Sequence, residues 1–200
     1  MDDDLFWNQR YASSAYLYGT EPNSFLAEHY GLLNGPVLSI SEGEGRNAVF
    51  LATQGLDVVG VDVSTVGLEK ARKLARSRGV EIKTIVSDLS TFEPEENHYG
   101  SVVSIWAHLP SAVRHRLYPR LERALRPDGI LLLESYSENQ LSRDTGGPKN
   151  LDTLMTVDKL RREFPALEPI VLREIERDVV EGEGHTGMAS VVQLIARRRA

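Results

Sequence analysis

The segment VLSISEGEGRNAVFLA, residues 37–52, constrains the fold of this chain more than any other. It reads as a short buried strand, a turn containing Gly43 and Gly45, and a helix that begins directly after the turn. Glycines let the backbone approach a ligand closely, and the free N–H groups at the start of a helix then point at that ligand. The segment therefore predicts a strand–turn–helix unit with a ligand site at the turn.

A second strand-like stretch, residues 58–62 (VVGVD), ends in a carboxylate. In a parallel α/β sheet this carboxylate is expected beside the glycine turn, where it can accept hydrogen bonds from both hydroxyls of a ribose. Asp62 has a second reading as the N-cap of the helix that follows. Taken with the glycine turn, the first reading predicts a site for an adenosine-type cofactor.

Short apolar runs alternate with helical patterns over most of the chain. Five runs rich in Val, Ile and Leu predict strands at 37–41, 57–62, 81–87, 101–106 and 129–135. Helices are expected between them at 46–54, 65–78 and 111–125, the second with Ser64 or Thr65 as N-cap and Gly79 past its end. This alternation implies right-handed crossovers and a mostly parallel sheet with helices on both faces.

The two ends of the chain depart from the alternation. Residues 1–35 are expected to form an extension with a helix around 23–33, and residues 137–152 a polar connection in which the Gly-Gly-Pro of 146–148 forbids regular structure. After a helix at 157–164, strands at 168–180 and 187–197 flank a glycine-rich turn at 181–184. These two strands are predicted to pair as an antiparallel hairpin.

Length and composition narrow the possible classes of protein. Two hundred residues suit one domain, and a net charge of −6 argues against a general nucleic-acid binder, which needs a basic face. The chain has no cysteine, and its five histidines lack the spacing of a zinc site, so no metal is expected. No apolar run suits a signal peptide or a membrane span. We therefore expect a cytoplasmic monomer or homodimer that acts on a small molecule, without nucleic-acid or membrane partners.

Two cofactor classes use a glycine turn with an acidic strand end, and the spacing Gly43-x-Gly45-x-x-Ala48 also fits the dinucleotide fingerprint. A tight turn without any ligand is a third reading. S-adenosylmethionine (SAM) is favoured because Glu42 and Glu44 would repel a pyrophosphate but can receive an ammonium or sulfonium group. The acid that follows the third strand, in SDL at 87–89, can accept a hydrogen bond from an adenine amino group, and the final hairpin is foreign to the six-stranded dinucleotide fold.

These motifs resemble those of the class I SAM-dependent methyltransferases over nearly the whole chain. VLSISEGEGRNA matches the first motif of that class, VVGVDVS the second, and SDLSTF the third, which contacts adenine. FWNQRY, YLYGTEPNSFL, EGEGRNAVFLA and TGGPK further resemble the small tellurite-resistance-type methyltransferases, which methylate small or metalloid substrates. The resemblance implies a Rossmann-like seven-stranded sheet in the order 3-2-1-4-5-7-6, with strand 7 antiparallel.

The first motif departs from the class at two positions. Ser39 stands where an acid is usual, and Ser41 stands where the first glycine is usual, so the acidic role is assigned to Glu42 or Glu44. The predicted cofactor contacts lie in the N-terminal extension, the glycine turn and three strand ends. They are Arg10, Tyr11, Glu42, Gly43, Glu44, Gly45, Arg46, Asp62, Val63, Asp88, Leu89 and Trp106.

The methyl acceptor is expected where the fourth strand ends, because ligands of open α/β sheets bind where the strand order switches. Trp106 can face the methyl group there, and His108 is a candidate general base or, alternatively, a cap for the helix beginning near residue 111. His185, placed in the hairpin turn, is the second catalytic candidate; the alternative is an exposed turn residue. Arg143 and Lys149, with Thr145, lie on the polar loop and are read either as contacts for an anionic acceptor or as a solvated surface.

The N-terminal extension is dense in aromatic residues: Trp7, Tyr11, Tyr16 and Tyr18, next to Arg10. One reading is a lid, residues up to about 26, that buries the cofactor and gives its sulfonium a cation–π or hydroxyl contact. The other reading is simple packing on the sheet.

The function predicted from the sequence is methyl transfer from SAM to a small acceptor such as a thiol, a metalloid oxyanion or another small polar molecule. Two alternatives stay open. An NAD-linked oxidoreductase would use the same fingerprint, although no nicotinamide or hydride-accepting motif is present. A SAM-binding regulatory protein without catalysis is compatible with the altered first motif at Ser39 and Ser41.

Overall fold

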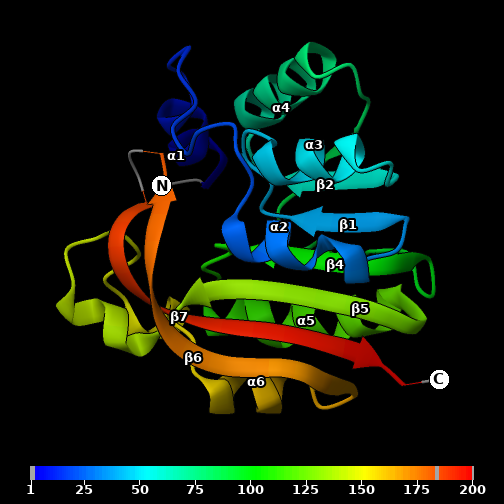
Figure 1. Cartoon of the computed structure of the whole chain (residues 1–200), viewed down its shortest axis with the longest axis vertical. Coiled ribbons are helices and arrows are strands. Elements are labelled where there is room, and N and C mark those ends of the chain that lie inside the picture. Colours follow the sequence, from blue (N-terminus) through cyan, green and yellow to red (C-terminus); the bar gives the residue numbers. More distant parts are fainter. Residues whose placement is uncertain (1–2, 183–184, 200) are drawn as a thin grey trace.

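The computed structural model describes residues 3–182 and 185–199. Its strands form one seven-stranded sheet (Figure 1) in the order β3-β2-β1-β4-β5-β7-β6. β1 to β5 pair in parallel, and β7 runs antiparallel to both of its neighbours. The bounds are β1 (Val37–Ile40), β2 (Val58–Asp62), β3 (Lys83–Val86), β4 (Tyr99–Ile105), β5 (Leu125–Tyr136), β6 (Leu167–Glu181) and β7 (His185–Arg198). The Rossmann-like topology predicted from the sequence is confirmed.

The helices follow the predicted alternation, with differences at the N-terminal end. The α-helices are α1 (Asp3–Arg10), α2 (Ser24–His29), α3 (Arg46–Thr53), α4 (Thr65–Ser77), α5 (Ser111–Ala124) and α6 (Val157–Glu163). The helix expected around 23–33 is instead α2 followed by a 3₁₀ turn, η1 (Tyr30–Leu32), and α1 was not predicted. The polar connection contains two short 3₁₀ turns, η2 (Glu138–Ser142) and η3 (Leu151–Thr153).

Side-chain caps explain where several helices begin. Ser64 is the N-cap of α4 and accepts a hydrogen bond from the Gly67 N–H, as the sequence predicted, and Gly79 follows the helix with φ +71°. Asn23 caps α2 in the same way, through the N–H of Leu26. α5 ends at Ala124, one residue before the predicted end. β5 starts at Leu125, four residues before the predicted strand, and Asp128 has a left-handed φ of 64° within it.

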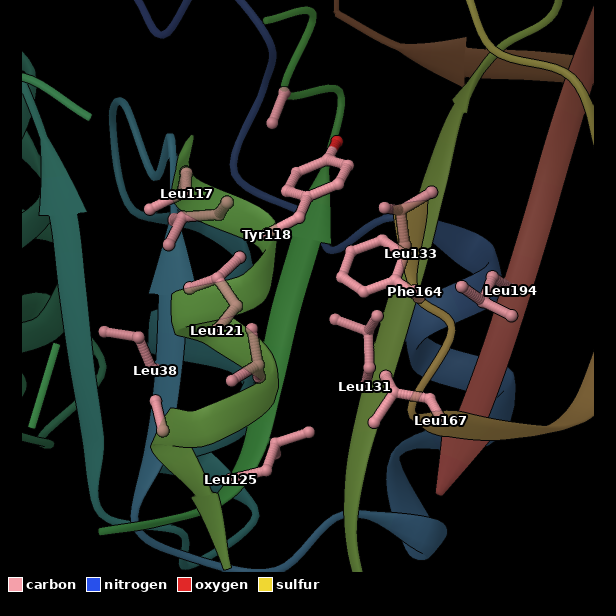
Figure 2. Close-up of a cluster of buried hydrophobic side chains, with 14 of the residues drawn as sticks. Leu38, Leu117, Tyr118, Leu121, Leu125, Leu131, Leu133, Phe164, Leu167 and Leu194 are labelled. Carbon is pink, nitrogen blue, oxygen red and sulfur yellow. The ribbon is translucent and has the colours of Figure 1, made fainter. Parts of the chain in front are cut away.

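Successive strand residues point to opposite faces of the sheet, and each face has its own apolar core. Figure 2 shows the first core, where Leu117 and Leu121 of α5, together with Phe164 directly after α6, pack on strand residues such as Leu38 and Leu131. On the other face, α2 and α3 pack on the alternate positions of the same strands; Phe25, Leu26, Leu51, Val37 and Leu132 are among these residues. Helices therefore cover both faces, as the sequence predicted.

The predicted hairpin is formed by β6 and β7, which pair antiparallel from Leu167↔Arg198 to Glu181↔His185. Residues 183 and 184 of the predicted turn lie outside the described residues. His185 was placed in that turn by the sequence analysis, which is wrong: it is the first residue of β7 and is buried, 7% exposed. In the described part of the chain, no helix has the length and apolar character needed to span a bilayer.

Candidate active site

The glycine turn after β1 has the backbone conformation that its sequence suggests. Ser41, Gly43 and Gly45 have φ values of 52°, 57° and 92°, in the left-handed region. A Cβ at Gly45 would lie 2.4 Å from the Cβ of Ala71 in α4, and one at Gly43 would lie 2.7 Å from the hydroxyl oxygen of Tyr11. Glycine is required at both positions, because a side chain would push apart α4 and the N-terminal segment that close on the turn.

Asp62 lies beside this turn, as the sequence predicted. Its Oδ2 accepts a hydrogen bond from the Gly43 N–H at 2.8 Å, and its Oδ1 accepts one from the Ser64 N–H at 2.8 Å. Burial raises the pKa of Asp62, and the backbone N–H donors oppose that rise. The N-cap reading is wrong, because Ser64 is the cap of α4. Each carboxylate oxygen keeps a second acceptor position, so the predicted ribose contact remains compatible with this arrangement.

The carboxylate of Glu42 lies next to Ser39, the position at which the first motif of the class usually has an acid. This carboxylate accepts a hydrogen bond from the hydroxyl of Ser39 and another at 2.8 Å from the Ala48 N–H in the first turn of α3. Burial raises the pKa of Glu42 to about 7, against the effect of these donors. The side chain of Glu42 thus holds β1 to the start of α3 from within the turn.

Glu44 connects the turn to the N-terminal segment. Its Oε2 accepts a hydrogen bond from the Leu17 N–H at 2.8 Å, and its Oε1 pairs with the ammonium of Lys70 in α4. The same ammonium donates to the carbonyl oxygens of Ser13 and Ala15. Glu44 therefore holds the segment against α4, and its predicted contact with the cofactor remains a prediction.

The N-terminal segment covers the glycine turn. Asn8 accepts hydrogen bonds from the hydroxyl of Ser64 at 2.7 Å and from the Val66 N–H at 3.2 Å, so α1 lies beside the start of α4 (Figure 1). Tyr11 is buried, and burial and the nearby Asp62 carboxylate raise its pKa, so its phenol stays a neutral hydroxyl donor. Arg10 is exposed and lies over the rings of Phe6 and Trp7 rather than over the turn.

The remaining predicted cofactor residues lie at the ends of β2, β3 and β4. Asp88 is exposed just past β3 and accepts a hydrogen bond from the Ser90 N–H at 2.7 Å. Leu89 is buried in the first apolar core, and Val63 is half-buried between Asp62 and Ser64. The roles of these residues toward a cofactor remain predictions.

A row of aromatic rings runs from the glycine turn to the end of β4. Tyr11 meets Tyr18 edge-on at 6.5 Å between ring centroids, and Tyr18 stacks on His185 at 4.7 Å. His185 stacks on Trp106 at 5.1 Å, and the row ends at Tyr136 and His108, whose rings stack at 5.3 Å. We call these six residues, Tyr11, Tyr18, His185, Trp106, Tyr136 and His108, the aromatic row. It brings together Trp106 and both predicted catalytic histidines.

The two histidines of the row are held neutral. Burial lowers the pKa of His108 to about 3, and nearby His185 acts in the same direction. Burial also lowers the pKa of His185 to about 4, and its Nδ1 shares a 2.8 Å hydrogen bond with the hydroxyl of Tyr136. The Nδ1 of His108 lies 3.3 Å from the Ser135 hydroxyl, and no described residue makes a well-formed hydrogen bond to its Nε2.

The alternative role of His108, as a helix cap, is wrong. The Ser111 N–H at the start of α5 donates to the Oδ2 of Asp152 at 2.9 Å, so a carboxylate from η3 caps this end. His108 therefore does not cap α5.

The polar loop after β5 lies against β6 and β7, and its cations are paired. Arg143 pairs with Glu176 of β6, and Lys149 lies 3.6 Å from the carboxylate of Asp144. Thr145 donates to the Met188 carbonyl of β7 at 2.8 Å. In this arrangement the loop stabilises the hairpin, and its contact with an acceptor remains a prediction.

Sequence reasoning missed a buried group of charged and amide side chains next to the aromatic row. Five residues from four elements form it: Asn23, Glu134, Arg177, Glu181 and Gln193. A signal was present in the strands, because Glu134 interrupts ILLLESY and Gln193 interrupts VVQLI. These two residues face each other in the β5–β7 register, and the Gln193 amide donates to Glu134 at 2.6 Å.

The sequence of this chain is similar to those of known proteins. Residues 37–129 match the family model described as a methyltransferase domain. A curated 2-heptyl-1-hydroxyquinolin-4(1H)-one methyltransferase of Mycobacteroides abscessus is 26% identical over 121 residues, covering 59% of this chain. The matched region is 53% of that relative, so the chain spans about half the length of the curated relative it matches.

Solved structures of related fold cover nearly the whole chain. A protein from a study of the conversion of a disulfide bond into a thioacetal group during echinomycin biosynthesis superimposes with a TM-score of 0.80 at 21% identity, covering 98% of this chain and 92% of its own. TehB from Haemophilus influenzae has a TM-score of 0.73 at 16% identity, with 98% and 67% covered. The N-methyltransferase NodS from Bradyrhizobium japonicum has a TM-score of 0.67 at 14% identity, with 100% of both covered.

Proposed function

We propose that this chain, which carries a class I SAM-dependent methyltransferase domain and resembles TehB as its motifs predicted, transfers a methyl group from SAM to a small-molecule acceptor. SAM is the cofactor that this domain implies. The observation that carries the proposal is the contact between Asp62 and the Gly43 N–H at 2.8 Å. It joins the two halves of a nucleoside site at the carboxyl edge of the sheet, where ligands of this fold bind.

The residues around the turn fit such a cofactor. The left-handed glycines let Tyr11 and α4 pack directly on the turn, and Asp62 offers acceptor positions to a ribose. Asp88, exposed at the neighbouring strand end, is proposed to meet the adenine amino group, and Arg10, Tyr11, Glu44 and Trp106 are proposed to line the methionine side.

When bound, SAM supplies a methyl group already activated by its sulfonium. The tasks left to the protein are to align the acceptor with that methyl group and to exclude water. We propose that residues 1–35 act as an extension of a single domain. The lid predicted up to about residue 26 is proposed to end near residue 22, because Phe25 and Leu26 are buried in the core. The contacts of Tyr11 and Leu17 on the glycine turn support closure there.

The acceptor is proposed to bind beside the aromatic row, next to Trp106. His108 has a neutral ring, so its Nε2 can accept a hydrogen bond from the substrate. A pKa of about 3 makes the ring a weak general base near pH 7, so its proposed role is to orient the substrate. His185 is proposed to support it from the same row, with its Nδ1 held by Tyr136. The acceptor named for the curated relative is a hydroxyquinolone, and a thiol, a metalloid oxyanion or another small polar molecule suits the same geometry equally.

The alternatives from the sequence are less well supported. An NAD-linked oxidoreductase is not favoured, because the matching domain and the named relatives are methyltransferases. A SAM-binding protein without catalysis differs from our proposal only in turnover. We further propose a cytoplasmic monomer or homodimer that binds neither nucleic acid nor membrane.

Radiolabelled SAM tests the function directly. The full chain is incubated with [methyl-³H]SAM and separate panels of hydroxylated heteroaromatics, thiols, amines, and selenite or tellurite. We expect label to appear in the product of at least one panel, at a rate that depends on enzyme concentration. Binding of SAM without transfer to any panel would support the regulatory alternative, and absence of SAM binding would refute the proposal.

A further inference from the structure

Glu181, the last residue of β6, has every acceptor position of its carboxylate occupied. Its Oε1 accepts hydrogen bonds from the Asn23 amide at 2.8 Å and from the Arg177 guanidinium at 2.9 Å. Its Oε2 accepts one from the indole Nε1–H of Trp106 at 2.6 Å and pairs with Arg46. A carboxylate has about four such positions, so this single side chain receives donors from four separate segments.

Three of the four segments are parts of the proposed active site. Arg46 is the first residue of α3 and directly follows Gly45 of the glycine turn. Trp106 belongs to the aromatic row and has a left-handed φ of 56° just past β4. Asn23 caps α2 and also fixes the base of the N-terminal segment, because its own N–H donates to Asn47 of α3 at 3.0 Å.

The residue after Glu181 contacts the segment itself. A Cβ on Gly182 would lie 2.4 Å from the Leu17 carbonyl oxygen and 2.5 Å from the Cα of Tyr18, so the backbone at this end of β6 packs directly on the segment. Fixing Glu181 therefore also fixes the surface against which Leu17 and Tyr18 close.

Charge balance explains how two carboxylates tolerate this burial. Glu134 is 0% exposed and Glu181 is 5% exposed, while Arg177 pairs with both and Arg46 pairs with Glu181. Two guanidinium groups thus match two carboxylates. Although burial acts to raise the pKa of Glu181, its neighbours, with Arg46 first, hold it below the usual value. The carboxylate stays ionised and can keep all four donors.

We propose that Glu181 is a positioning residue, which sets the indole of Trp106, the start of α3 and the base of the lid in one fixed arrangement. This proposal rests on the proposed function only for its catalytic consequence. Arg46 was predicted as a cofactor contact, but its guanidinium pairs with the carboxylate of Glu181. Its proposed role is therefore to be held by Glu181 at the start of α3. Loss of the carboxylate should loosen the lid and the indole together, since they share one acceptor group.

The test compares Glu181→Gln with Glu134→Gln in a Trp7→Phe background, where Trp106 is the remaining tryptophan. Both variants remove one buried carboxylate from the same charged group. The carboxylate of Glu134 contacts neither the indole of Trp106 nor Arg46 in the described structure, so Glu134 is the matched control. Its backbone carbonyl accepts a hydrogen bond from the Trp106 N–H at 3.0 Å, and the substitution leaves that carbonyl in place. A glutamine at 181 can accept from one pair of donors only, because its amide nitrogen would face the other pair.

Three readouts are measured: Trp106 emission, chymotrypsin cleavage between Tyr11 and Tyr18, and the kinetic constants with SAM. For Glu181→Gln we expect emission at longer wavelength and lid cleavage faster by roughly fivefold or more, because cleavage tracks the population of the open lid. We also expect kcat to fall by roughly tenfold or more while S-adenosylhomocysteine affinity changes by less than about threefold. Glu134→Gln should lower stability, but leave emission unchanged and lid cleavage within about twofold.

Equal changes of emission and cleavage in both variants would overturn the proposal, since Glu181 would then have no effect beyond that of removing either buried carboxylate. If Glu181→Gln does not fold, Trp106→Phe removes one donor without changing any charge. It should still speed lid cleavage by roughly twofold or more, and an unchanged rate would equally contradict the proposal. Emission and cleavage require neither cofactor nor turnover, so their outcome is independent of the proposed function. That function fails if the parent protein does not bind SAM or transfers methyl to no acceptor.

Discussion

The two halves of the proposed active site are built in different ways. On the cofactor side, Glu42 and Asp62 each bond backbone N–H groups of the turn or of the helix starts next to it. On the hairpin side, the aromatic row joins Tyr18 to His185, and Glu181 binds Asn23, which lies 158 residues away in the chain. The contacts of the first half join the turn to the strand and helix ends beside it, whereas the contacts of the second half form only when β5, β6 and β7 are assembled.

This difference predicts how each half responds to change. A substitution on the cofactor side should act on one contact with the cofactor, whereas a change on the hairpin side should act on the geometry of several residues at once. The N-terminal segment contacts both halves, through Leu17 on Glu44 and through Tyr18 on His185. Removing it should therefore have the largest effect.

Deletion of residues 1–21 is expected to lower turnover by roughly 100-fold or more, because it exposes both halves to water and frees the acceptor from alignment. The cut must precede Asn23, since Phe25 and Leu26 are buried in the core. Circular dichroism should show a folded protein with weakened SAM binding. A truncated protein that keeps full activity would refute the lid.

Asp62→Ala should weaken SAM binding by at least about tenfold, because each lost charge-assisted hydrogen bond contributes about 1.5–3 kcal/mol. Asp57→Ala is the matched control: Asp57 lies just before β2 and pairs only at the surface with Lys83, at 3.3 Å. Equilibrium dialysis with labelled SAM measures both. Equal affinities for the two variants would sink the assignment of the ribose site.

His108→Ala is expected to lower kcat by roughly tenfold to 100-fold while SAM affinity stays within about twofold. The reason is that the proposed contact of His108 is with the methyl acceptor and not with the cofactor. His98→Ala serves as control, since that ring is exposed and pairs with Glu95 at 3.4 Å. Arg143→Ala should have a smaller effect, given its pairing with Glu176. Full activity of His108→Ala on a true substrate would remove His108 from the acceptor site.

Glu42 gives the smallest expected effect, on stability. Burial raises its pKa to about 7 in the folded state, so the folded protein binds a proton that the unfolded chain releases at lower pH. The favourable contribution of Glu42 is then present at acidic pH and is lost as the pH rises toward about 7. Glu42→Gln mimics the protonated form, so its Tm should exceed the parent's by about 2–4 °C at pH 8 and match it near pH 5. A constant difference across this range would contradict the raised pKa.

The two halves of the site differ in how far they could be predicted from the sequence, because one depends on nearby residues and the other on distant ones. The glycine turn, the placement of Asp62 and the mostly parallel sheet were predicted from contiguous residues and from the alternation of strands and helices. The order of the strands came from the resemblance to the methyltransferase class. For the departure at Ser39 the sequence offered Glu42 or Glu44, and in the structure the hydroxyl of Ser39 donates to the carboxylate of Glu42.

The hairpin side was predicted only in part. Trp106 and His108 were placed correctly at the end of β4, but His185 was assigned to a turn because the strand start after residues 183–184 carries no apolar pattern. The four-donor arrangement around Glu181 depends on the register of β6 against β7 and on a guanidinium from α3. No contiguous stretch of sequence encodes this arrangement, and the two polar residues within apolar strands, Glu134 and Gln193, were its signal in the sequence.

Isothermal titration calorimetry of the full chain with S-adenosylhomocysteine and with NAD tests the central claim most directly. We expect saturable binding of S-adenosylhomocysteine, strongly reduced in Asp62→Ala, and no saturable binding of NAD. Saturable NAD binding without S-adenosylhomocysteine binding, or no binding of either ligand, would contradict a SAM site at the glycine turn.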